Sequence, residues 1–312
     1  MSQREVIVVG AGVCGLTAAY TLQKQGVRVR VLEAEDHVGG KTTAVRRDGF
    51  QLNTGATLLA GGYATRLRPL TDTTAKPLLP IAGRPMVDWI VDRIDEGGGV
   101  EEVHLVTNAV YAADFERWAK ARAITVWNDG TRSNEDRLGA LGDVALAVER
   151  GDLEGDDLLV IAADNLFEFS LRDYIAFFRE KGDGSAVAVH RLADPSLARL
   201  YGVIELDGDD RVTGFEEKPE HPRSDLVSTA TYIYHRSHVP LLGRYLAEGN
   251  PPDPPGRFLT WLCERAPLYG YRFDESWFDI GAPEQLLEAD NRYRERAGLP
   301  ARAHYSPDLL TN

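Results

Sequence analysis

Cysteine and methionine are scarce in this chain, which has 312 residues and only two of each. Cys14 and Cys263 cannot build a disulfide framework, and neither belongs to a CxxC or Cys/His spacing of the kind that binds zinc. A reducing cytoplasm is therefore the expected location. No apolar run reaches the length of a membrane helix, so no membrane span and no membrane partner are expected.

Positive charge is also in short supply. The 35 Lys and Arg residues face 48 Asp and Glu residues, which leaves a formal net charge of −13 at pH 7. Such a field repels polyanions, so nucleic acid is not an expected partner. Hydrophobic residues make up 43% of the chain and charged residues 27%, which is an ordinary globular composition that can bury a sizeable core.

Apolar runs alternate with amphipathic segments along most of the chain. This alternation predicts a Rossmann-like α/β fold, in which a mixed, mostly parallel sheet is covered by helices. A hairpin signal at residues 203–215 predicts an antiparallel addition to that sheet. The predicted strands cover residues 103–107, 124–127, 158–162 and 186–189, and the predicted helices cover 86–94, 111–120, 142–149, 171–181 and 283–296.

The first glycine motif lies near the start of the chain. Gly10, Gly12 and Gly15 form a G-x-G-x-x-G turn between an apolar strand and a helix, and Glu33 ends the next strand. The glycines allow a pyrophosphate to approach the helix N-terminus, and an acid at position 33 can accept hydrogen bonds from ribose hydroxyls. This spacing predicts a βαβ dinucleotide-binding fragment suited to FAD or NAD.

Residues 1–55, which include Gly39-Gly40-Lys41, resemble the N-terminus of flavin-dependent amine oxidases and phytoene-desaturase-like enzymes. Such flavoenzymes need a much longer chain to complete the cofactor domain. We therefore interpret residues 1–55 as a truncated Rossmann-type segment that packs without a cofactor, with FAD or NAD binding as the alternative. The main domain is then expected to span residues 56–312.

A second glycine turn follows another apolar strand. Its residues are Leu59, Ala60, Gly61 and Gly62, with Thr65, Arg66 and Lys76 after it. Backbone N–H groups in such a turn can face triphosphate oxygens, and the two cations add positive charge. Residues 58–86 resemble the signature of sugar-1-phosphate nucleotidyltransferases, except that Ala64 stands where the family usually has glycine. If position 64 needs a positive φ, its Cβ is costly.

The resemblance continues to about residue 296 with the motifs in the family's order. Gly139 lies in a stretch similar to the family's second glycine loop, near the base and sugar. Asp164 ends an apolar strand, where a carboxylate suits a hard cation. Asp164 and Asp279 resemble the family's two metal-binding carboxylates. Tyr201, Gly202, Glu217 and Lys218 resemble its sugar-phosphate pocket.

This resemblance implies a fold of the nucleotide-diphospho-sugar transferase type and a Mg²⁺-dependent enzyme. The enzyme would join a nucleoside triphosphate to a sugar 1-phosphate and release pyrophosphate. Asp164 and Asp279 would hold Mg²⁺, while Arg66, Lys76 and Lys218 would neutralise phosphate charge. Leu59, Ala60, Gly61, Gly62, Thr65 and Gly139 would contact the nucleotide.

Two other functions remain open from the sequence. The N-terminal fingerprint favours an FAD- or NAD-dependent oxidoreductase. The replaced glycines at Ala64 and Ala140 would suit a catalytically silent nucleotide-sugar binding protein. The residues leave the base and the sugar open, and relatives in the family are often dimers or tetramers, which makes a homo-oligomer one expectation.

Overall fold

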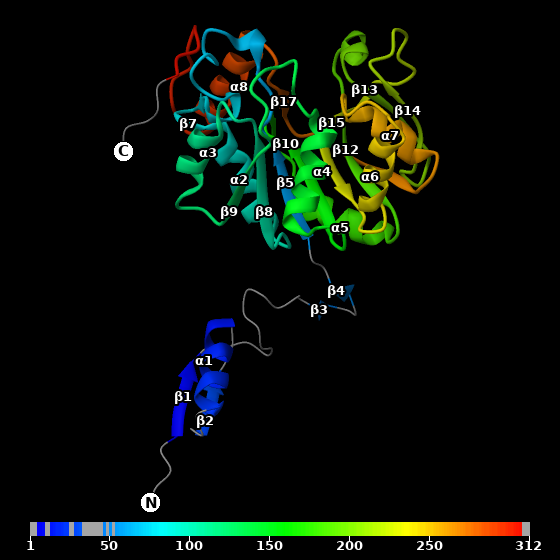
Figure 1. The fold of residues 1–312 in the computed structure, drawn as a ribbon. Helices are drawn as coiled ribbons and strands as arrows, with labels where there is room; N and C mark the ends of the chain where they lie inside the picture. The colour runs from blue at the N-terminus through cyan, green and yellow to red at the C-terminus, as the bar shows by residue number, and fades with distance from the viewer. Residues whose placement is uncertain are drawn as a thin grey trace, which may run out of the picture. The chain divides into compact units, whose positions relative to one another are not determined.

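The computed structural model describes residues 5–9, 13–24, 28–32, 46–47, 50–51 and 54–307 (Figure 1). The chain divides into two compact units, Met1–Asn53 and Thr54–Asn312. In the first unit, β1 (Glu5–Val9) pairs in parallel with β2 (Arg28–Leu32). The helix α1 (Val13–Lys24) connects them, and β3 (Arg46–Arg47) pairs with β4 (Phe50–Gln51).

The predicted dinucleotide motif is only partly covered by this description. Gly15 lies in the first turn of α1, so a strand, a helix and a second strand follow one another as the sequence predicts. Gly10, Gly12 and Glu33 lie outside the described residues.

The second unit is built on one sheet, which has nine strands within residues 54–307. Its centre is parallel: β5 lies between β10 and β8, and β8 also pairs with β9. Parallel strands end at the same edge of a sheet, so the loops that follow these four strands gather at one edge. The bounds are β5 (Thr54–Leu59), β8 (Glu102–Thr107), β9 (Ile124–Asn128) and β10 (Asp157–Ala162).

The other half of the sheet is largely antiparallel. β15 runs antiparallel to β10, β12 and β13, so the first residues of β15 reach the edge at which β10 ends. β13 forms the predicted hairpin with β14, and β16 pairs with β12. The bounds are β12 (Ser185–Arg191), β13 (Gly202–Leu206), β14 (Val212–Glu217), β15 (Leu226–Tyr234) and β16 (Leu268–Phe273).

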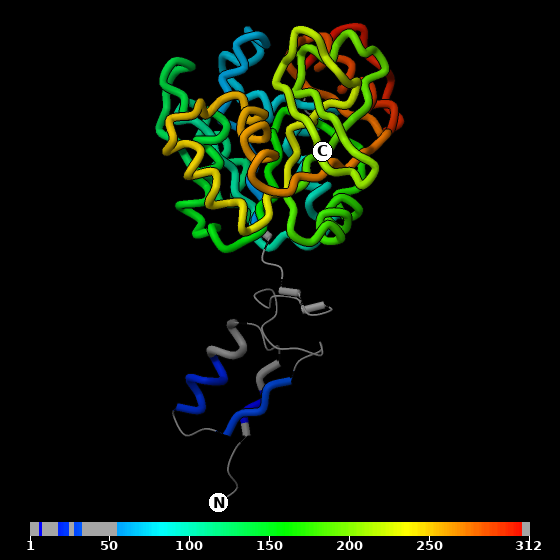
Figure 2. Tube along the Cα trace, turned by 90° about the vertical axis from the view of Figure 1, so that its right-hand side faces the viewer, coloured from blue at the N-terminus to red at the C-terminus, as the bar shows by residue number. Residues whose placement is uncertain are grey.

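Both faces of the central strands are buried, which explains their continuous apolar runs. On β10, Leu159 and Ile161 pack into one core with α2, α3, α5 and α8. Leu158 and Val160 pack into a second core with α4, α6 and α7, which Figure 2 shows in green, yellow and orange. The bounds are α2 (Met86–Gly97), α3 (Ala112–Ala119), α4 (Ala140–Gly151), α5 (Leu171–Lys181), α6 (Val239–Ala247), α7 (Gly256–Cys263) and α8 (Pro283–Arg296).

The predicted fold class is confirmed, since a mixed sheet with a parallel centre is covered by helices on both faces. α5 and α8 have the predicted bounds, whereas α6, α7 and β16 were not predicted. No helix among the described residues is long and apolar enough to span a membrane. The small elements are β6 (Pro80–Ile81), β7 (Arg84–Pro85), β11 (Asn165–Phe167), β17 (Trp277–Asp279), η2 (Thr65–Leu67), η3 (Lys76–Leu78) and η4 (Pro195–Leu200).

The position of β5 leads to a prediction about truncation. A chain that starts at Thr54 keeps this central strand, and we expect it to unfold cooperatively, as we expect of the full chain. A chain that starts at Ala60 loses β5, leaves β8 and β10 without their shared partner, and should not fold. Thermal unfolding followed by circular dichroism measures both. A chain from Ala60 that melts like the chain from Thr54 would contradict the role of β5.

Candidate active site

A cavity of about 400 Å³ opens beside the carboxyl ends of β5 and β10. Most of the predicted site residues line it. Ala60 does not, because it is buried and its N–H donates to the Val106 carbonyl at 2.8 Å. Thr65 does not line it either, and Lys76 reaches it only through Asp164. The predicted residues on its wall are Leu59, Gly61, Gly62, Arg66, Gly139, Asp164, Tyr201, Gly202, Glu217, Lys218 and Asp279.

The glycine turn after β5 is held from two sides. The Asn108 amide donates to the Gly61 carbonyl at 3.0 Å. A Cβ at position 61 would lie 2.5 Å from Oδ2 of Asp143, which is closer than two such atoms can approach. A side chain at position 61 would therefore have to displace the Asp143 carboxyl group, which fills the space above the glycine.

Ala64 adopts the left-handed conformation, with φ 43° and ψ 44°. The turn is closed by the Leu67 N–H and the Thr71 hydroxyl, each of which donates to the Ala64 carbonyl at 3.0 Å. A left-handed alanine costs roughly 1 kcal/mol relative to glycine. Alanine at position 64 thus strains the turn.

The predicted loop around Gly139 is shorter than expected, because α4 already begins at Ala140. Gly139 precedes it with a φ of 81°, which favours glycine. Asp253 caps the helix from a distant loop: its Oδ1 accepts from the Ala140 N–H at 2.8 Å. Ala140 is therefore the first helical residue, where a glycine is not needed.

Acidic side chains gather at this end of the cavity. Asp143 is 6% exposed, and its carboxyl group shares a hydrogen bond with Asp129. Burial, together with the charges of Asp129 and Asp253, raises the pKa of Asp143 to about 8. Asp143 therefore carries a proton at neutral pH and donates it to Asp129 above Gly61.

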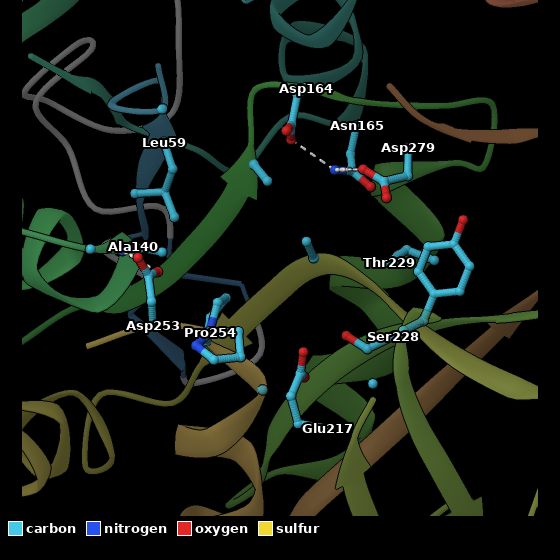
Figure 3. Close-up of a pocket in the computed structure, with 18 of the residues that line it drawn as sticks. Leu59, Ala140, Asp164, Asn165, Glu217, Ser228, Thr229, Asp253, Pro254 and Asp279 are labelled. Carbon is cyan, nitrogen blue, oxygen red and sulfur yellow. Dashed lines mark hydrogen bonds between the residues drawn. The ribbon is translucent and has the colours of Figure 1, made fainter. Parts of the chain in front are cut away.

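The two predicted metal carboxylates are brought together by a short antiparallel pair. β11 and β17 place Asn165 opposite Asp279, and the Ile280 N–H donates to the Asp164 carbonyl at 3.1 Å. The Lys76 ammonium group donates to Asp164 Oδ2 at 2.5 Å and to the Ile280 carbonyl at 2.8 Å. Figure 3 shows Asp164 and Asp279 on either side of Asn165.

Electrostatic interactions connect these carboxylates with the three predicted cations. Burial would raise the pKa of Asp164, but the Lys76 ammonium group holds it below its usual range. Burial and the Asp164 charge raise the pKa of Asp279 to about 6, against the opposing effects of Lys76, Arg66 and Lys218. Five residues from four separate segments of the chain thus act on one another in one site.

The donor set fits a hard divalent cation that also binds substrate oxygens. Within the part of the chain that the structure describes, no cluster of three or more His, Cys, Asp or Glu side chains could enclose a metal alone. Mg²⁺ is commonly held by one or two carboxylates, with substrate phosphates and water completing the shell. Asp164 and Asp279 can supply those two carboxylates.

The opposite end of the cavity combines a cation, an acid and aromatic rings. The Lys218 N–H donates to the Tyr201 carbonyl at 3.0 Å and Lys218 has a φ of 49°, an uncommon backbone conformation that tends to occur at functional sites. Burial raises the pKa of Glu217, which Lys218 and Arg257 oppose. Tyr201 packs edge-on against Trp277, with ring centroids 5.2 Å apart.

Several residues on the cavity wall were not predicted. Asn165 follows the predicted Asp164 directly, so the motif that revealed Asp164 could also have revealed Asn165. Trp277 likewise lies in the same motif as Asp279, but a role was predicted for Asp279 alone. Ser228 and Thr229 at the start of β15, and Asp253 in a proline-rich loop, have no motif that would have revealed them.

The fold and this cavity define an α/β protein with a phosphate-type glycine turn and a carboxylate pair. The sequence profile of the nucleotidyl transferase family matches residues 56–296, and the chain belongs to that family. A second profile, the NAD(P)-binding Rossmann-like domain, matches residues 8–74. The suspected family and the preceding Rossmann-type segment are thereby confirmed.

Individual relatives agree with this assignment. The chain is 30% identical to a mannose-1-phosphate guanylyltransferase of Mycobacterium tuberculosis, over 82% of this chain and 69% of the relative. It is 26% identical to the bifunctional protein GlmU of Methanocaldococcus jannaschii, over 76% of this chain and 53% of the relative. A putative glucose-1-phosphate thymidylyltransferase from Bacillus anthracis has the same fold, with a TM-score of 0.67, 23% identity, and coverage of 78% of this chain and 96% of that chain.

The raised pKa of Asp143 leads to a prediction about stability and pH. The folded protein holds this proton up to about pH 8, whereas an unfolded Asp releases it near 3.8, so the folded state binds more protons in between. The stability from this group is full below about pH 4 and declines until about pH 8. Asp143→Asn keeps a donor to Asp129 at every pH. Its free energy of unfolding, minus that of wild type, should therefore rise by up to about 1.4 kcal/mol per pH unit in that window.

Urea denaturation at several pH values measures this difference. Asp95→Asn, on an exposed position of α2, is the matched control and should show a flat difference. An equally flat difference for Asp143→Asn would show that Asp143 is ionised in the folded protein.

Proposed function

We propose that this protein transfers a nucleotidyl group from a nucleoside triphosphate to a sugar 1-phosphate. An oxygen of the sugar phosphate attacks the α-phosphorus in line, the bond to the bridging oxygen breaks, and pyrophosphate leaves. The nucleophile is already an anion, so a covalent enzyme intermediate is not needed. Catalysis then consists of positioning and charge neutralisation.

The observation that carries this proposal is the convergence at Asp279. Besides burial, its pKa is shaped by Asp164, by Lys76 and Arg66 from the segment after β5, and by Lys218, so three separate segments act on it. A half-buried carboxylate pair on which three cations act is suited to phosphates and a divalent cation rather than to a neutral ligand. The related guanylyltransferase of Mycobacterium tuberculosis acts on mannose 1-phosphate according to its name, which supports the same substrate class.

The cavity offers a separate place for each substrate. Gly61, Gly62 and Gly139 form the end at which the triphosphate binds, and Arg66 neutralises charge on the departing pyrophosphate. Lys76 bridges phosphoryl oxygens once the substrate competes for its contact with Asp164. At the other end, Lys218 binds the phosphate of the sugar, and Glu217 accepts hydrogen bonds from sugar hydroxyls.

Asp164 and Asp279 are the residues that would hold Mg²⁺. A bound Mg²⁺ supplies Lewis-acid polarisation of the phosphoryl oxygens. The carboxylates themselves orient the site, and the Lys76 ammonium group favours the negative charge of Asp164 against the effect of burial. Residues 1–53 are not needed for this chemistry in our proposal, since every proposed catalytic residue lies in the second unit.

The activity is tested by pyrophosphate release with Mg²⁺, using five nucleoside triphosphates (dTTP, UTP, GTP, CTP and ATP) against a panel of hexose 1-phosphates. One productive pair identifies the base and the sugar. Asp164→Asn should lower turnover by about 100-fold or more, because it removes a charge that acts on the transition state. Asp274→Asn, on an exposed position, is the matched control.

Near-normal turnover of a folded Asp164→Asn variant would contradict the metal assignment. Silence of the wild-type protein across the panel, with ligand-dependent melting retained, would instead support a catalytically silent nucleotide-sugar binding protein.

Lys218 leads to a prediction that concerns one substrate only. Lys218→Ala should raise the KM for the sugar 1-phosphate by roughly 10- to 100-fold, because a charge-assisted hydrogen bond is worth about 1.5–3 kcal/mol. The KM for the nucleoside triphosphate should change by less than threefold or so. Steady-state kinetics with each substrate varied in turn measures both values, with Lys120→Ala on the exposed end of α3 as control. An equal rise in both KM values would contradict a contact between Lys218 and the sugar 1-phosphate alone.

A further inference from the structure

Asn165 links the two predicted metal carboxylates directly. Its side chain is buried, and the residue is only 4% exposed. The amide nitrogen donates to Asp164 Oδ1 at 2.9 Å and makes a longer contact of 3.4 Å with Asp279 Oδ1. Figure 3 shows this nitrogen between the two carboxylates, with a dashed line to each. Both amide hydrogens are thereby used.

The orientation of this amide is set by Trp277. The indole N–H donates to Asn165 Oδ1 at 2.8 Å. An indole N–H is only a donor, so the atom that faces it must be the amide oxygen. The amide nitrogen then has to face the carboxylates. Trp277 is itself positioned by the pairing of β17 with β11 and by the edge-on contact with Tyr201.

This arrangement assigns a different task to each carboxylate oxygen. The Oδ1 atoms of Asp164 and Asp279 are occupied by one neutral donor, which offsets part of the repulsion between two like charges. Asp164 Oδ2 accepts from Lys76. Within the described residues the Lys76 ammonium group donates to Asp164 and to the Ile280 carbonyl, so among these contacts the Asn165 amide is the group that joins the two carboxylates.

We propose that Asn165 is a positioning residue that sets the separation and orientation of Asp164 and Asp279 for a divalent cation, and that the Trp277 indole fixes its amide. The inference rests on the proposed function, since it concerns the same carboxylates. A purely structural role would only satisfy buried polar groups, and its loss would change stability without changing the affinity for a cation.

The test compares two variants with two matched controls in the full chain. Asn165→Leu keeps the size of the side chain and removes both donors. Trp277→Phe keeps an aromatic ring against Tyr201 and removes the indole N–H. Asn291→Leu removes an amide that bonds the Arg302 backbone far from the cavity, and Trp89→Phe removes an indole donor to the Ile81 carbonyl.

The first readout is binding of Mn²⁺ alone, measured by electron paramagnetic resonance. Loss of a group that orients metal ligands typically weakens metal affinity by about 10- to 100-fold. We expect this loss for Asn165→Leu and a loss near the lower end of that range for Trp277→Phe. Both controls should bind Mn²⁺ as the wild type does. Thermal unfolding shows whether Asn165→Leu and Asn291→Leu lose comparable stability.

The second readout is the Mg²⁺ concentration that gives half-maximal pyrophosphate release. It should rise for Asn165→Leu, with the KM for the sugar 1-phosphate unchanged. Wild-type affinity for Mn²⁺ in a folded Asn165→Leu variant would overturn the inference, as would a wild-type protein that binds no Mn²⁺. A wild-type protein that binds Mn²⁺ but releases no pyrophosphate would overturn the proposed function alone, because the Mn²⁺ affinities still decide the role of Asn165.

Discussion

Two half-buried carboxylates held beside each other, those of Asp164 and Asp279, are the constraint on which the rest of the site depends. Loss of contact with water and, second, the neighbouring Asp164 charge both disfavour the charged form of Asp279 and raise its pKa to about 6. The protein offsets the cost locally with the Lys76 ammonium group and the Asn165 amide. While no ligand is bound, the repulsion between the two carboxylates is only partly offset. Such a site is suited to bind a cation and the phosphates that accompany it.

The sheet makes this arrangement feasible. The parallel centre brings the ends of β5 and β10 to one edge, and antiparallel β15 starts at that edge. The glycine turn, the carboxylate pair and the sugar end therefore face one cavity although they are far apart in the chain. The protonated Asp143 carboxyl group adds a hydrogen bond to Asp129, which ties α4 to the loop after β9 above Gly61.

Much of this organisation could be predicted from the sequence, for identifiable reasons. The strands and helices around β10 have strong periodicity, and the glycine turn and both Asp motifs have recognisable spacing. By contrast, α7 consists of a short apolar run, which does not distinguish a helix from a strand. The task of Asn165 depends on Trp277, which is 112 positions away, and no local pattern contains that contact. The protonation of Asp143 likewise depends on burial beside Asp253, which a linear sequence does not show.

The central claim is that the α-phosphate of a nucleoside triphosphate moves to a sugar phosphate in the cavity at the carboxyl edge of the sheet. The most direct measurement uses a triphosphate labelled at the α- or the γ-phosphate and follows the label by chromatography. Our account predicts that the α-label appears in the sugar nucleotide and the γ-label in pyrophosphate. A γ-label found in the sugar product would show phosphoryl rather than nucleotidyl transfer and would contradict the account.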